Sequence, residues 1–242
     1  MSILHGGAYL FRGMRLITLP GIRLFALIPL VINISLFAGL SLYLLLQADG
    51  LVEAVLPTLP AWLQWLEWLA WLMFVIAAVV LSFFAVSLAA NLIAAPFNEL
   101  LAERVEQHLT GAGNTPADPG QWMRTIPAAV MGELHKLGYF AVRAVPLLLL
   151  YLVPGVNVLA PLLWLLFSAW MLALEYTDYP MGNHEIQFQS RRRLLSQQRF
   201  TALGFGGAVL GGTIIPLVNL FIMPAAVAGA TALWVERLKA NR

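Results

Sequence analysis

Four long apolar segments, each without a charged residue, alternate with polar segments along this chain. They cover residues 24–47, 69–95, 144–174 and 200–235. Each of the first two has the length of one helical membrane crossing, because a helix rises about 1.5 Å per residue and the hydrocarbon core is about 30 Å thick. We therefore predict two full transmembrane helices, over 24–47 and over 68–110, the second with a cytoplasmic extension.

The third and fourth apolar segments each contain a helix break. Pro154-Gly155 interrupts the third, and a stretch from Pro216 to Pro224 interrupts the fourth. The arm before the first break is about ten residues, or about 15 Å, which reaches only the middle of a membrane. We predict a partially inserted helical hairpin at the end of 121–174, after an amphipathic helix, and a second one over 200–235. Short, tilted full crossings are the alternative.

The charged residues predict the topology. Residues 48–67 contain acidic side chains but no Lys or Arg, so the positive-inside rule makes this segment external and both termini cytoplasmic. All 14 Lys and Arg residues then lie on the cytoplasmic side. The amphipathic segment 1–23 is expected on the membrane surface. The basic segment 175–199 is expected in the cytoplasm beside lipid phosphates.

Composition places the chain among integral membrane proteins and removes several classes of function. It is 60% hydrophobic and 11% charged, whereas soluble domains are about 25% charged. With a net charge of only +2 it is not expected to bind nucleic acid. There is no cysteine, no paired nucleophile and base, and no nucleotide-binding motif, so we expect no enzyme activity, no cofactor and no metal. The apolar segments lack ionisable residues, which favours channel-like conduction over a tightly coupled carrier.

Two sets of polar residues are candidates for lining a conduction path. Asn157 and Asn219 lie at the two breaks, where a helix that restarts nearby would aim free N–H groups at an anion. The alternative is that each asparagine simply caps its helix. The second set follows Pro96 on a helical face predicted to lie opposite an apolar stripe, and it is either a solvated surface or the wall of a vestibule. Its members are Asn98, Glu103 and Glu106.

Four motifs, in this order over almost the whole chain, resemble those of the CysZ sulfate-permease family of bacterial inner membranes. They are Gly21-Ile22-Arg23, the stretch from Ala95 to Glu106 that begins Ala-Pro-Phe-Asn-Glu-Leu-Leu, the Pro-Gly-Val-Asn break from Pro154 to Asn157, and Glu175-Tyr176-Thr177-Asp178-Tyr179-Pro180.

The resemblance implies an all-α, multi-pass inner-membrane protein with two long transmembrane helices and two partially inserted hairpins. It implies sulfate uptake for cysteine synthesis without an ATPase, with sulfite and related oxyanions as further candidate substrates, and assembly into dimers or larger homo-oligomers in contact with membrane lipids. The family's sulfate site maps onto Gly21, Ile22 and Arg23. Some members have a second arginine next, where this chain has Leu24. The conduction path maps onto the region of Asn98, Glu103 and Glu106.

A non-transporting membrane scaffold is the main alternative. Its small residues would serve helix packing and oligomerisation. They are Gly204, Gly207, Ala208, Gly211 and Gly212.

Overall fold

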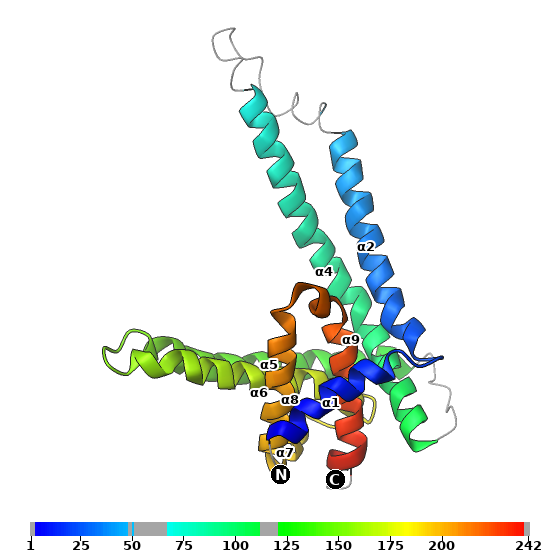
Figure 1. Ribbon diagram of the computed structural model, residues 1–242, viewed down its shortest axis with the longest axis vertical. Coiled ribbons are helices and arrows are strands. Elements are labelled where there is room, and N and C mark those ends of the chain that lie inside the picture. The colour runs from blue at the N-terminus through cyan, green and yellow to red at the C-terminus, as the bar shows by residue number, and fades with distance from the viewer. Residues whose placement is uncertain (1–2, 48–49, 51–66, 112–120, 240–242) are drawn as a thin grey trace. The chain divides into compact units, whose positions relative to one another are not determined.

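The computed structural model describes residues 3–47, 50, 67–111 and 121–239, and the elements it describes are helical (Figure 1). They are α1 (Ile3–Leu16), α2 (Arg23–Leu46), α4 (Glu67–Thr110), α5 (Gln121–Leu150), the short 3₁₀ helix η2 (Asn157–Leu159), α6 (Ala160–Gly182), α7 (Phe188–Gln197), α8 (Arg199–Thr213), α9 (Pro216–Leu233) and the π-helical turn η3 (Trp234–Leu238). The chain forms two compact units. One is Leu27–Phe97, and the other joins Met1–Ala26 to Asn98–Arg242.

The smaller unit contains most of α2 and the first part of α4. Nearly all side chains of α2 are apolar, and many of the large ones point outward, as Val31 and Leu42 do. Such a surface is stable only in lipid or against another protein. By length and composition α2 could cross a membrane, and so could the continuous helical stretches Asn157–Gly182 and Pro216–Leu238 of the larger unit. The predicted external segment 48–67 lies almost wholly outside the described residues.

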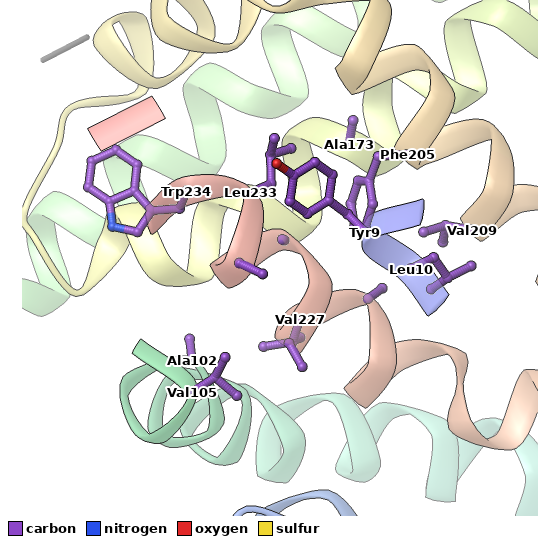
Figure 2. Close-up of a cluster of buried hydrophobic side chains, with 14 of the residues drawn as sticks. Tyr9, Leu10, Ala102, Val105, Ala173, Phe205, Val209, Val227, Leu233 and Trp234 are labelled. Carbon is purple, nitrogen blue, oxygen red and sulfur yellow. The ribbon is translucent and has the colours of Figure 1, made fainter. Parts of the chain in front are cut away.

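The larger unit is built around α1, which packs against both α8 and α9. Apolar side chains from α1, α4, α6, α8, α9 and η3 meet there (Figure 2). The largest fully buried ones are Trp234 and Phe205. Hairpin α8–α9 covers the side of α1 that carries Tyr9 and Leu10. Part of the apolar stripe of segment 1–23, which the sequence analysis places on the membrane surface, is therefore buried inside the protein.

Glycines allow these helices to touch backbone to backbone. A Cβ built on Gly6 would lie 2.7 Å from the backbone nitrogen of Phe205, and one on Gly13 would lie 2.6 Å from that of Gly229. Both separations are too short for a methyl group. Small residues at such crossings are typical of membrane helices, since close approach maximises van der Waals contact where the hydrophobic effect contributes little.

The two breaks form the tips of two helical hairpins, α5–α6 and α8–α9, which cross one another within this unit (Figure 1). At the first tip Gly155 has a left-handed φ of +84°, which glycine adopts without strain. Pro224 lies inside α9, so the second break is confined to the residues just before Pro216.

Candidate functional site

The loop carrying Gly21, Ile22 and Arg23 is a turn that starts α2. Gly21 has a φ of +89°, and no atom lies within 4 Å of a Cβ built on it. The N–H groups of Ile22 and Arg23 both donate to the carbonyl oxygen of Leu19, each at 3.1 Å. The Ile22 side chain is only 3% exposed and belongs to the core, whereas Arg23 is exposed. The turn thus anchors the loop through Ile22 and leaves the Arg23 guanidinium at the surface.

A second arginine approaches this loop from the end of α4. The guanidinium carbon of Arg104 lies 5.3 Å from the centre of the Phe25 ring, within the range of a cation–π contact. Phe25 stands two residues after Arg23 at the start of α2. The structure therefore brings a second arginine to the first turn of α2, although the residue that follows Arg23 is Leu24.

Asn98 faces the core, which corrects the helical face predicted for it. It lies on one side of α4 with Leu101, Ala102 and Val105, at the three- and four-residue spacing of a single face, and is 4% exposed. Its amide is directed toward the Tyr179 hydroxyl of α6, but its Nδ2 makes no hydrogen bond of ordinary geometry. A buried amide donor without a partner is unusual and marks a position where a ligand or water can be accepted.

The Glu106 carboxylate contacts two side chains, Lys239 and His184. One carboxylate oxygen accepts a hydrogen bond from Nζ of Lys239 at 2.8 Å, and the other lies 2.9 Å from Nε2 of His184. The His184 ring also lies against Trp234, with centroids 5.5 Å apart. Glu103, one turn earlier, accepts a hydrogen bond from Gln107 at 2.8 Å within the same helix. The end of α4, the segment after α6 and the C-terminal segment are thereby linked.

The other two polar candidates lie apart from this region, at the hairpin tips. Asn157 is exposed at the start of η2, and Asn219 is exposed inside α9, where its N–H donates to Ile215. Neither side chain caps a helix: α6 begins at Ala160 and α9 at Pro216, without a side-chain cap in either case. The helical stretch after the first break does begin at Asn157, in η2, whereas α9 begins at Pro216, before Asn219. The alternative that each asparagine caps its helix is therefore wrong.

Comparison with known proteins agrees with these motifs. The sequence profile of the family described as Sulfate transporter CysZ/Etoposide-induced protein 2.4 matches residues 9–224. That match includes the loop at Gly21, the polar end of α4 and both hairpin tips. The chain belongs to this family.

Its relatives within the CysZ family align along nearly their whole length. The protein named Sulfate transporter CysZ of Pseudomonas fluorescens strain Pf-5 is 47% identical to this chain over 235 residues, which cover 97% of this chain and 94% of the relative. The counterpart in Pseudomonas aeruginosa strain PAO1 is 44% identical over 239 residues, covering 98% and 96%. The one in Salmonella typhimurium strain LT2 is 44% identical over 244 residues, covering 99% and 96%.

The sequence analysis does not single out two residues of this region, His184 and Lys239. Both contact Glu106 although they are 78 and 133 residues away in the chain. No local spacing signals contacts between residues so far apart in the chain.

Proposed function

We propose that this chain is a sulfate permease that conducts sulfate across the membrane. The observation that carries the proposal is the near full-length identity to proteins named Sulfate transporter CysZ. Each of these relatives is at least 44% identical to this chain over at least 94% of its own length.

Arg23 is the proposed capture group for sulfate. Its guanidinium is exposed at a turn that Leu19 and buried Ile22 hold in place. A planar fork of N–H donors fits two oxygens of a tetrahedral oxyanion, and each charge-assisted hydrogen bond contributes roughly 1.5–3 kcal/mol. Gly21 leaves the approach open because it carries no side chain. Arg104 is the second cation we assign to the site, from its contact with Phe25.

The end of α4 is the proposed wall of the path. The buried Nδ2 of Asn98 is a donor, which suits an anion. Glu106 would repel sulfate if its charge were uncompensated, but Lys239 is bonded to the same carboxylate. The proposed path therefore combines a hydrogen-bond donor, the Asn98 amide, with a carboxylate, Glu106, whose charge Lys239 compensates. The lack of a nucleotide motif and of ionisable residues inside the apolar segments favours conduction without a coupled ATPase.

We further propose that the protein resides in the bacterial inner membrane, with both termini cytoplasmic, and supplies sulfate for cysteine synthesis without itself catalysing a reaction. Sulfite and related oxyanions share the tetrahedral or pyramidal oxygen geometry that Arg23 would bind.

Assembly into dimers or larger homo-oligomers is supported by Gly207 and Gly211 of α8, where an added Cβ meets no atom within 4 Å. Gly204 and Gly212, in contrast, are used within the chain, against Ile3 and Ile222.

The test is radiolabelled sulfate uptake into proteoliposomes, with and without a proton gradient. We expect wild-type protein to conduct sulfate in both conditions. Arg23→Lys keeps the positive charge but loses the fork, so sulfate binding should weaken tenfold or more, about 1.4 kcal/mol. Arg15→Lys, at an exposed position of α1, is the matched control and should behave as wild type.

Two results would contradict the proposal. Liposomes with folded wild-type protein that take up no more sulfate than empty ones would favour the scaffold alternative. Unchanged affinity in both Arg23→Lys and Arg23→Ala would remove Arg23 from the site while leaving the transport function standing.

A further inference from the structure

The base of hairpin α5–α6 carries a partly neutralised cluster of charges. Nζ of Lys136 lies 2.8 Å from a carboxylate oxygen of Glu175 and 3.3 Å from one of Asp178. Arg191 of α7 donates to the other oxygen of Asp178 at 2.7 Å. Two cations and two carboxylates therefore compensate one another, and they tie α5, α6 and α7 together.

Two further arginines at this base remain uncompensated. The guanidinium carbon of Arg143 lies 3.8 Å from the centre of the Tyr139 ring, and that of Arg192 lies 5.1 Å from the same centre. Within the described part of the chain no carboxylate pairs with either arginine. Because both guanidinium carbons are measured from the same ring centre, they lie no farther apart than these two distances combined. One tetrahedral anion can bridge two guanidiniums at such a separation where they share one side of the ring.

Tyr139, the ring that both arginines contact, is held in place by other side chains. Its hydroxyl accepts a hydrogen bond from Nε1 of Trp170 at 2.9 Å, and its ring meets Phe188 edge to face with centroids 5.9 Å apart. Tyr139, Trp170 and Phe188 belong to α5, α6 and α7. The contacts from two other helices hold the ring in one orientation and so preorganise both arginines.

The cluster lies where the chain enters its third apolar segment. Arg143 is the last charged residue before residues 144–174, and Trp170 lies near the other end of that charge-free segment. Tyrosine, tryptophan and arginine at such a position are typical of the membrane–water interface. Beside Arg143 on α5, Val142 is 70% exposed and Val145 is 54% exposed. Cationic groups thus adjoin apolar surface that acyl chains can cover.

We propose that Arg143 and Arg192 form a binding site for the phosphodiester of an anionic phospholipid. The phosphate would bridge the two guanidiniums above Tyr139, and the acyl chains would lie along the exposed valines of α5. A soluble phosphate would satisfy the same donors but gain nothing from the apolar surface. Basic pockets at the membrane interface recognise acidic lipid headgroups in this way. The site is independent of the sulfate path, since it uses none of the residues assigned to that path.

The experiment measures lipid binding to purified, delipidated full-length protein by native mass spectrometry. The probes are short-chain phosphatidylglycerol, short-chain phosphatidylcholine and inorganic phosphate. We expect phosphatidylglycerol to bind wild type at least tenfold more tightly than phosphatidylcholine. Arg143→Gln and Arg192→Gln, tested separately, should each weaken phosphatidylglycerol binding fivefold or more. Arg193→Gln removes the same charge from an exposed neighbouring position on α7 and should change binding less than twofold.

Three results would overturn the proposal. Equal weakening by Arg193→Gln would mean that any positive charge near the membrane attracts the lipid. Equal binding of the two lipids would remove the selectivity for anionic headgroups. Competition by millimolar inorganic phosphate would assign the site to a soluble oxyanion. Thermal unfolding in detergent without lipid shows that each variant is folded, and using two single variants keeps the test valid if one fails to fold.

Discussion

Replacing Gly13 with alanine should separate α1 from α9. The new Cβ would lie 2.6 Å from the backbone nitrogen of Gly229 and closer still to the carbonyl oxygen of Ala225, whereas ordinary contacts begin at 3.4 Å. Both obstacles are backbone atoms, so no side-chain rotation relieves the clash. The helices must move apart by about 1 Å, and a gap of this size forfeits a quarter to a half of each van der Waals contact along the shared face.

The expected cost follows from two opposing effects. Overpacking a tight contact typically costs about 1–3 kcal/mol, and backbone obstacles place this site at the upper end. Alanine is a better helix former than glycine by about 1 kcal/mol, which offsets part of that cost. We therefore expect a net destabilisation of about 2 kcal/mol, or a lowering of Tm by roughly 4–8 °C for a chain of this size.

Gly7→Ala is the matched control on the same helix. The nearest side-chain neighbour of its added Cβ is Cβ of Ala208 at 3.7 Å, an ordinary contact. Only the gain in helix propensity remains, so Tm should stay unchanged or rise slightly. Thermal unfolding of the purified protein in one detergent, followed by size-exclusion chromatography, measures both variants. A Tm for Gly13→Ala equal to that of wild type would refute the close packing of α1 on α9.

Three further predictions concern the polar residues. Glu106→Gln should lower stability by about 1–2 kcal/mol, because it weakens the contacts to His184 and Lys239. Glu103→Gln affects a hydrogen bond to Gln107 of the same helix and should cost less than about 0.5 kcal/mol; thermal unfolding compares the two variants, and equal losses would contradict the linking role of Glu106. Glu103→Ala should alter sulfate flux at normal expression and oligomer size if this helix face lines the path, and unchanged flux would return it to ordinary surface. Single cysteines at Asn157 and Asn219 should resist a membrane-impermeant thiol reagent applied from outside, since partially inserted tips do not reach the external side; efficient labelling of both would favour full crossings.

The sequence alone determined the features that depend on local composition. A charge-free segment long enough to cross a membrane predicts a helix whatever surrounds it, because backbone N–H and C=O groups without hydrogen bonds are costly in lipid. The helix α2 accordingly spans Arg23–Leu46. Pro154-Gly155 likewise predicted a tip, since proline and glycine act on the backbone of their own neighbourhood. The family was equally accessible, because its motifs are short and ordered along the chain.

Only the tertiary structure decided which side of each helix is covered. Asn98 looked like part of a polar face, yet α4 turns it inward with Leu101 and Val105, since the partners of α4 lie more than 70 residues away in the chain. The same holds for Glu106 with His184 and Lys239, and for Arg143 with Arg192 on one tyrosine ring. Helical periodicity describes the order of side chains around one axis, but burial and pairing depend on a second helix. That information lies in contacts between distant segments and not in the spacing within any one of them.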